Sequence, residues 1–211
     1  DSMILPPADD GEKVEVVRGP NIKPFPVNKE LPETVSGKVL IKLGDNITTD
    51  HIMPSNAKLL PYRSNIPYLS DYCLTPCDPD FPKRARENGG GFIVGGSNYG
   101  QGSSREHAAL VPLYLGIKGV IAKSFARIHM ANLINSGILP MVFDNEADYD
   151  GIDSEDELVI ENIREQIKSG DNIVVFNKTK NKEFKVKLIL SERQVEIILA
   201  GGLLNYTKKQ N

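Results

Sequence analysis

The pattern of apolar and polar positions divides this chain into an irregular first part, a regular centre and a strand-rich last part. Six prolines fall within residues 1–36, interleaved with charged residues. Because proline fixes φ and offers no backbone N–H, this segment is expected to be an extended arm or linker. The apolar run at 39–43 ends at a Gly-Asp-Asn turn signal and predicts a buried strand, so the folded domain is expected to cover residues 37–211.

The centre of the chain alternates between short apolar runs and longer helical patterns. Strands are predicted at 91–95, 119–123 and 139–143, and helices at 103–115 and 126–135. Strands that are joined by helices through short connections need crossovers, so these three strands should be parallel. The sequence therefore predicts an α/β fold with a central parallel βαβαβ unit.

The regions on either side of this unit are predicted to be different in kind. Residues 53–91 contain six further prolines and predict a long loop with short helical turns, and loops of this length often carry function. Beyond residue 150, short apolar runs predict a smaller β layer, with strands near 157–160, 173–176 and 183–190. A closing helix is expected from Ser191, because Gln194 completes a capping box with it.

Composition narrows the class of protein. The 211 residues include 25 basic and 28 acidic side chains, a net charge of −3 that gives no field to attract nucleic acid or a membrane surface. The longest apolar runs are far shorter than the ~20 residues of a membrane span. Two cysteines are too few for a disulfide framework, which favours a reducing, cytoplasmic compartment. The chain begins with Asp and shows no signal peptide, and we expect a fragment or a processed product.

A glycine-rich turn between the predicted strand at 91–95 and the helix after it is the most informative segment. Backbone N–H groups at such a turn can bind an anion, and Arg105 would add a bidentate partner for a carboxylate. No Lys follows Gly102, so the turn does not match the phosphate-binding loop and a carboxylate is the better ligand. The structural alternative is that Ser103 and Glu106 form a capping box that only starts the helix.

A second polar segment, residues 44–52, follows the first predicted strand. Its Asp, Asn and Thr side chains could simply build a turn, and a lone histidine such as His51 is more often structural. Arg63 belongs to the irregular region, where an arginine is by default exposed to solvent. Neither segment indicates a function by itself.

Taken together, four segments resemble the aconitase family and, within it, the C-terminal swivelling domain. They are residues 16–22, 44–52, 98–108, and 123–129 followed by Asn132. The segment 98–108, Asn-Tyr-Gly-Gln-Gly-Ser-Ser-Arg-Glu-His-Ala, is the most specific of the four. The resemblance implies a swivelling β/β/α domain that closes over a substrate and a cluster held by three other domains.

The resemblance also implies roles for individual residues. Ser103 would be the catalytic base, and Asp50 would organise the active site with support from His51. The substrate-binding side chains would be Arg63, Ser104 and Arg105. The implied reaction interconverts citrate and isocitrate through cis-aconitate, as in the tricarboxylic acid cycle, and a tricarboxylate needs several cationic partners of this kind.

A [4Fe–4S] cluster belongs to the same implied chemistry, held by three cysteines outside this domain. Cys73 and Cys77 lack the rest of such a ligand set, so we expect no metal bound by this chain. The expected partner is therefore the cluster-bearing N-terminal part of the same protein. The isolated chain should fold and be inactive.

Two alternatives remain. Within the same superfamily, the chain could be a free-standing small subunit of isopropylmalate or homoaconitate isomerase. The proline-rich connector, and Arg63 matched to a third carboxylate, favour aconitate hydratase instead. In a different class, some aconitases bind RNA stem-loops once their cluster is lost, but this slightly acidic chain gives that reading no support and no nucleic-acid partner is expected.

Overall fold

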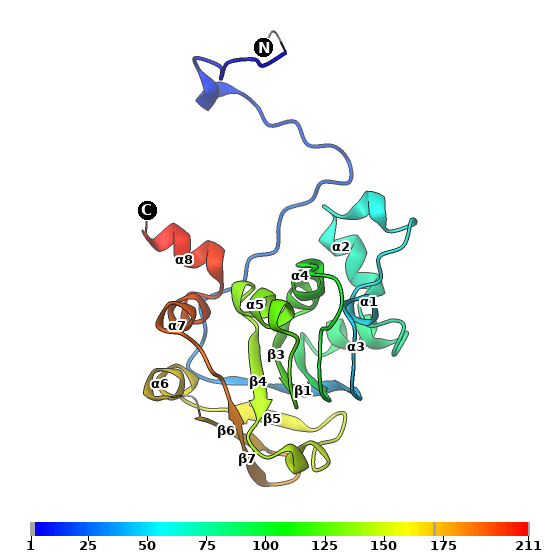
Figure 1. The fold of residues 1–211 in the computed structure, drawn as a ribbon, viewed down its shortest axis with the longest axis vertical. Coiled ribbons are helices and arrows are strands. Elements are labelled where there is room, and N and C mark those ends of the chain that lie inside the picture. Colours follow the sequence, from blue (N-terminus) through cyan, green and yellow to red (C-terminus); the bar gives the residue numbers. More distant parts are fainter. Residues whose placement is uncertain (1–2, 171, 211) are drawn as a thin grey trace.

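A closed sheet organises the molecule in the computed structural model, which describes residues 3–170 and 172–210 (Figure 1). The strand order around the barrel is β1-β2-β3-β4-β7-β6-β5. The strands are β1 (Val35–Lys42), β2 (Gly91–Gly95), β3 (Ile117–Ala122), β4 (Leu139–Phe143), β5 (Glu157–Ile160), β6 (Asn172–Asn177) and β7 (Lys182–Lys187). The α-helices are α1 (Thr49–Ile52), α2 (Ile66–Leu69), α3 (Phe81–Glu87), α4 (His107–Tyr114), α5 (Arg127–Asn135), α6 (Ile163–Ser169), α7 (Glu192–Leu199) and α8 (Leu203–Gln210).

One half of the barrel is parallel, as the sequence predicts. Strands β2, β3 and β4 run in the same direction, and β1 adds a fourth parallel strand through the pairs Val39↔Phe92 and Lys42↔Val94. All five residues of β2 are buried, because this central strand is covered on both faces. The carboxyl ends of β1, β2 and β3 therefore lie at one edge of the sheet.

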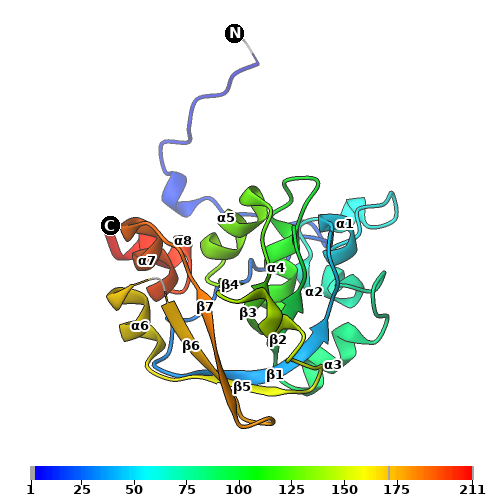
Figure 2. The same ribbon diagram turned by 60° about the horizontal axis from the view of Figure 1, so that its bottom comes forward.

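The other half is antiparallel and closes the barrel. β5, β6 and β7 form a meander, β5 pairs with the first half of β1, and β7 pairs with the end of β4. The smaller β layer expected from the sequence is thus joined to the parallel unit at both sides (Figure 2). The eight residues of β1 make this possible, because its first half bonds to β5 and its second half bonds to β2.

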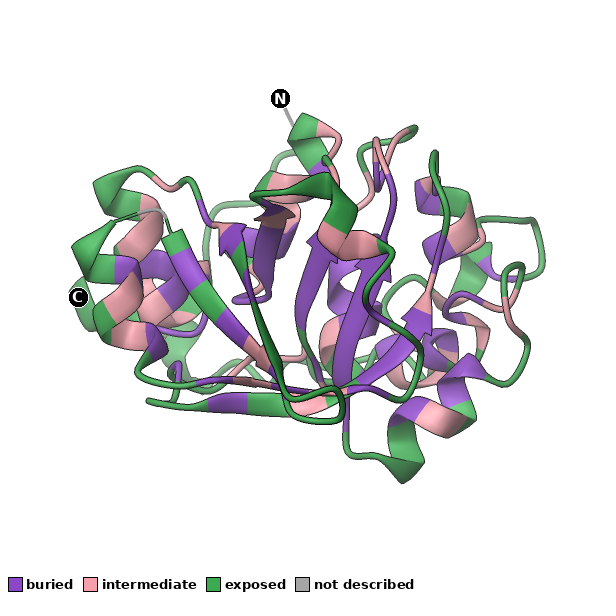
Figure 3. Cartoon of the chain, turned by 90° about the horizontal axis from the view of Figure 1, so that it is seen from below, coloured by how far each residue is buried: buried purple, intermediate pink, exposed green. Residues whose placement is uncertain are grey.

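Two apolar clusters lie on opposite faces of the parallel strands. Phe92 and Val94 of β2 belong to the cluster that also contains Leu158 and Val175 from the antiparallel half. Ile93, between them, belongs to the cluster that α1 to α4 cover. Successive side chains of β2 thus point to opposite faces of the sheet, as expected for a strand. The buried strands lie at the centre of Figure 3.

The helices follow the sequence patterns with one important shift. Helix α5 begins at Arg127, and α7 begins after Ser191, whose hydroxyl accepts from Gln194 N while the Gln194 side chain accepts from Ser191 N. The predicted capping box of the last region is confirmed. The helix predicted at 103–115 instead begins at His107, so residues 103–106 precede it.

The part of the chain that the structure describes also contains short 3-10 helices at Gly11–Lys13, Leu60–Tyr62, Ser70–Tyr72 and Glu146–Tyr149. The first of these lies in the N-terminal arm, which extends away from the barrel and leads into β1 (Figure 1). The arm joins the body near its end, where Leu31 N donates to Leu199 O at 3.1 Å. The domain boundary at residue 37 stays a prediction. Within the described residues, every helix is too short or too polar to cross a membrane.

Candidate active site

Three loops meet at the carboxyl edge of the parallel strands. The loop after β1 bonds to the glycine-rich turn after β2, with Gly100 N donating to Ile47 O at 2.7 Å and Thr49 N donating to Gln101 O at 2.8 Å. The turn also bonds to the loop after β3, because Tyr99 N donates to Ser124 O at 2.9 Å. Three of the four segments that carry the family resemblance, residues 44–52, 98–108 and 123–129, are therefore joined by backbone hydrogen bonds into one surface, whereas residues 16–22 lie in the arm.

The glycine-rich turn has a shape that needs glycine. Gly100 and Gly102 have φ values of +81° and +104°, which side-chain-bearing residues rarely adopt. A Cβ atom at Gly100 would lie 2.1 Å from the ring of His129, so the turn packs directly on that ring. The turn is fixed by this contact and by its bonds to the loop after β1.

Ser103 follows this turn and does not cap a helix. The N-cap of α4 is Glu106, and no side-chain hydrogen bond caps it within the described part of the chain. Arg105 N donates to Ser103 O at 2.8 Å, which closes a tight turn before the helix starts. The capping-box alternative for Ser103 and Glu106 is therefore wrong, and the exposed Ser103 hydroxyl is not used to start α4.

Arg105 is oriented by Asp50. Its Nη1 donates to Asp50 Oδ1 at 2.6 Å and its Nη2 donates to Asp50 Oδ2 at 3.0 Å, a bidentate pair between segments 55 residues apart. Nη1 also approaches Met53 O at 3.3 Å. The hydrogen bond from Arg105 holds the pKa of Asp50 below its ordinary value. Within the described residues, Arg105 Nε donates no hydrogen bond, so the Nε–Nη2 edge remains for a ligand.

His51 helps to place Asp50. His51 N donates to Thr48 Oγ1 at 3.1 Å, and Thr48 N donates to His51 Nδ1 at 3.0 Å, which is a capping box for α1. An imidazole whose Nδ1 accepts carries its proton on Nε2 when it is neutral. His51 thus has a structural task in starting the helix that carries Asp50.

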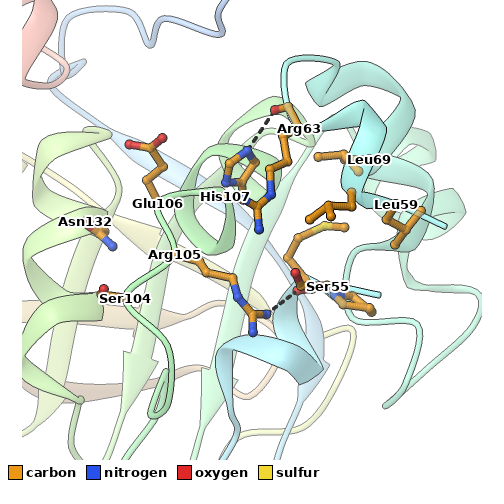
Figure 4. Close-up of a pocket in the computed structure, with 12 residues that line it drawn as sticks. Ser55, Leu59, Arg63, Leu69, Ser104, Arg105, Glu106, His107 and Asn132 are labelled. Atoms are coloured by element: carbon orange, nitrogen blue, oxygen red, sulfur yellow. Dashed lines mark hydrogen bonds between the residues drawn. The ribbon is translucent and has the colours of Figure 1, made fainter. Parts of the chain in front are cut away.

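A cavity of 410 Å³ collects most of the other predicted residues (Figure 4). Arg63, Ser104 and Arg105 line it. The remaining lining is apolar on one side and polar on the other: Met53, Pro54, Ser55, Leu59, Leu60, Leu69, Glu106, His107 and Asn132. Two guanidinium groups beside an apolar wall suit a ligand that has carboxylates and a hydrocarbon part.

The loop that carries Arg63 is tied to α4. His107 Nε2 lies 2.8 Å from Arg63 O, and the dashed line in Figure 4 marks this bond. Tyr62, next to Arg63, stacks on Tyr68 with ring centroids 4.2 Å apart. Arg63 itself is exposed and forms no ion pair within the described residues. Its side chain is therefore available to a ligand, while its backbone is fixed.

A second cavity, of 210 Å³, adjoins the first, since Ser104 and Asn132 line both. Ser103 lines the second cavity together with Thr49, Gly102 and His129. His129 is 2% exposed, and burial lowers its pKa to about 4. Neither ring nitrogen of His129, nor the hydroxyl of Thr49, has a hydrogen-bond partner within the described residues.

The structure thus brings five of the six predicted side chains to two adjoining cavities, either as lining residues or, for Asp50, through Arg105. His51 acts one step further away, through α1. His107 and His129 had no predicted role from the sequence. Each stands in a segment that carries the family resemblance, and that position was the available signal.

The cysteines do not form part of this site. Cys73 is fully buried in an apolar cluster, and burial raises the pKa of its thiol well above the ordinary value. Cys77 is exposed, and partial burial of its sulfur raises its pKa as well. Among the residues that the structure describes, no group of three or more His, Cys, Asp or Glu side chains could hold a metal ion. These residues do not fit an iron–sulfur cluster, which needs several thiolates.

Several known proteins are similar to most of this chain. The family model of the aconitase C-terminal domain matches residues 76–146. The 3-isopropylmalate dehydratase small subunit 2 of Archaeoglobus fulgidus is 47% identical over 168 residues, which cover 80% of this chain and 92% of that protein. The probable mitochondrial aconitate hydratase of Dictyostelium discoideum is 33% identical over 237 residues, covering 97% of this chain and 30% of that protein.

A solved structure gives the same result in three dimensions. The crystal structure of 3-isopropylmalate dehydratase from Methanocaldococcus jannaschii superposes with a TM-score of 0.67 at 37% identity. The match covers 84% of this chain and 95% of the other. The homoaconitase small subunit of the same organism is 42% identical, over 80% of this chain and 89% of its own length.

Proposed function

Because the chain belongs to the family that unites aconitase C-terminal domains with 3-isopropylmalate dehydratase small subunits, we propose that it forms half of the active site of a hydro-lyase. The reaction is removal and re-addition of water on a hydroxy-polycarboxylate. The observation that carries this proposal is the convergence of Arg63, Ser104 and Arg105 on one cavity, with Ser103 at the adjoining one.

Each side chain has a defined task in this proposal. Arg63 and Arg105 bind substrate carboxylates from two sides of the cavity, and Asp50 keeps the Arg105 guanidinium in one orientation. Ser104 donates a hydrogen bond to the substrate. Ser103, as its alkoxide, takes the proton from the substrate carbon and becomes a neutral hydroxyl; its oxygen caps no helix, and the positive charge of Arg105, two residues further on, favours the alkoxide.

The other half of the site lies on a partner. This chain has no thiolate set for a [4Fe–4S] cluster among its described residues, so we place that group on a larger polypeptide. Several of the most similar relatives carry the name small subunit, which implies a larger companion. We propose that this chain works with such a cluster-bearing companion and is inactive without it.

Two observations support a substrate of the isopropylmalate or homoaconitate type over the citrate expected from the sequence. The relatives with 47% and 42% identity, matched over about nine-tenths of their own length, are named for those substrates. The wall formed by Met53, Leu59, Leu60 and Leu69 also gives an apolar substituent a place beside the arginines, which within this pair favours the isopropyl group of isopropylmalate. The free-standing small subunit is therefore our preferred reading.

Aconitate hydratase is the second candidate, because the alignment with one such enzyme covers more of this chain. The alignment with the Dictyostelium aconitate hydratase covers 97% of this chain, so it includes most of the arm, whereas the alignment with the Archaeoglobus small subunit covers 80%. An arm shared with a longer protein fits a connector between domains.

Reconstitution tests both candidates. The chain is mixed with a cluster-loaded large subunit of the 3-isopropylmalate dehydratase type, and formation of the unsaturated acid is followed by ultraviolet absorbance with 3-isopropylmalate, homocitrate or citrate. We expect turnover only in the mixture, and mainly with the first two substrates. Turnover of any of them by the chain alone would contradict the half-site, and citrate as the preferred substrate would select aconitate hydratase.

Replacing Arg63 by Lys examines the site directly. Lysine keeps the charge and loses the planar fork, so kcat/KM in the mixture should fall roughly 10- to 100-fold. Arg193→Lys on α7, an exposed residue far from the cavity in sequence, is the matched control and should have no effect. A rate for Arg63→Lys within about twofold of the parent would remove Arg63 from the site.

A further inference from the structure

Helix α5 begins with hydrogen-bond donors that the rest of the fold leaves unused. Its N-cap is Ala126, whose side chain cannot accept a bond, and the first bond inside the helix runs from Met130 N to Ala126 O at 3.0 Å. Within the described residues, the backbone N–H groups of Arg127, Ile128 and His129 donate to no acceptor. Such donors, with the positive end of the helix dipole, favour an anion.

Buried polar side chains line the same place. Thr49 and His129 are each 2% exposed, and the Thr49 hydroxyl and both His129 ring nitrogens are without partners in the described chain. Buried polar atoms are rarely left unpaired in folded proteins, because each then loses its hydrogen bonds to water without replacement. Both residues line the 210 Å³ cavity at the start of α5. Unused bonding capacity at a cavity of this size points to a polar occupant.

The charged side chain that lines the cavity favours a negatively charged ligand. Arg127 is the only lining residue with a formal charge, and no acidic side chain lines the cavity. Arg127 forms no ion pair within the described residues. The other lining residues with polar side chains, Ser103, Ser104 and Asn132, are all able to donate hydrogen bonds.

We propose that the cavity at the N-terminus of α5 is a carboxylate-binding subsite, built by Arg127 and the free N–H groups of residues 127–129. It is continuous with the cavity of Arg63 and Arg105, because Ser104 and Asn132 line both. A polycarboxylate with one carboxylate on Arg105 can place another in this subsite and so present the carbon between them to Ser103. That the carboxylate belongs to the substrate rests on the proposed function, whereas the subsite itself does not.

Titration with tricarballylate tests the subsite. This tricarboxylate has no hydroxyl group and cannot be dehydrated. It is added to the full ¹⁵N-labelled chain at an ionic strength held constant with sodium chloride, and amide shifts are followed by NMR. We expect saturable shifts at residues 127–129. Arg127→Gln should weaken binding measured at these amides roughly 3- to 10-fold, with Arg127→Lys in between.

The matched control is Arg193→Gln, which removes one exposed arginine from α7 and should bind like the parent. Shifts confined to residues 104–107, or equal affinities for Arg127→Gln and Arg193→Gln, would overturn the subsite and leave the proposed function standing. Conversely, normal shifts at 127–129 in a chain that supports no turnover with any cluster-loaded partner would refute the proposed function and keep the subsite.

Discussion

Two serines in different parts of this chain share a sequence pattern and have different structural roles. Ser103 is followed three residues later by Glu106, and Ser191 is followed in the same way by Gln194. Ser191 forms a complete capping box and α7 starts directly after it. Ser103 caps nothing, since α4 starts at His107. The Ser-x-x-Glu/Gln pattern therefore permits a helix start, and the surrounding fold decides whether one forms.

The reason for the difference lies outside each tetrapeptide. Bonds from the loop after β1 hold the backbone at Gly100 and Gln101, and Gly102 follows with φ +104°, so the chain leaves this turn in a direction that delays the helix. Among the described residues, no such turn with a positive-φ glycine directly precedes Ser191, which is extended at ψ 160° like an ordinary N-cap. A hydroxyl released from capping near two arginines is available for chemistry.

The largest effect that this comparison predicts is on catalysis. Ser103→Ala in the mixture with a cluster-loaded partner should lower kcat by about 10²–10⁴-fold, the usual range for loss of a general base. The midpoint of thermal unfolding should stay that of the parent, because Ser103 caps no helix. Rate assays and thermal scans on the same protein check both halves. Near-parental kcat together with a lower unfolding temperature would restore the capping role.

The next effect is on the pH dependence of stability and concerns His129, whose ring packs against Gly100 in the turn before Ser103. The pKa of His129 is lowered from 6.5 to about 4 by burial, so the unfolded chain binds this proton more readily than the folded one. The free energy of unfolding therefore has its full value with respect to His129 above pH 6.5. It falls as the pH is lowered toward 4, by up to roughly 3 kcal/mol. His129→Leu should remove this part of the pH dependence, as measured by urea unfolding.

His107→Gln is the control for that measurement, because glutamine can keep a donor near Arg63 O and leaves His129 in place. It should retain the parental pH dependence of the free energy of unfolding. If His129→Leu also retained the full parental dependence, His129 would not be the buried neutral group that the turn covers.

The smallest effect is on the stability that the capping box of Ser191 contributes. Ser191→Ala removes the acceptor of Gln194 N and should lower the free energy of unfolding by about 0.5–2 kcal/mol, while Ser191→Gly should cost only a few tenths. Turnover in the reconstituted mixture should not change. Urea unfolding and rate assays on both variants measure this. Equal stability of parent and Ser191→Ala would show that the capping box contributes nothing, and would weaken the contrast with Ser103.

The sequence by itself determined the features that depend on short separations along the chain. The short apolar run Phe92-Ile93-Val94 predicted a strand, and strand–helix alternation predicted the parallel unit. The capping box at Ser191 involves atoms three residues apart, so it too could be predicted. Four segments taken together indicated the family, and Arg105 beside the glycine-rich turn predicted a carboxylate ligand.

Only the tertiary structure decided the features that join distant segments. The pairing of Arg105 with Asp50 spans 55 residues, and the burial of His129 depends on a glycine turn from another loop. Barrel closure depends on β1, whose second half bonds to β2 about 50 residues away and whose first half bonds to β5 about 120 residues away. Local patterns cannot encode such contacts, because they depend on which loops the sheet brings to one edge. The same physical reason explains why Ser103 stays free of a helix that its own sequence would allow it to cap.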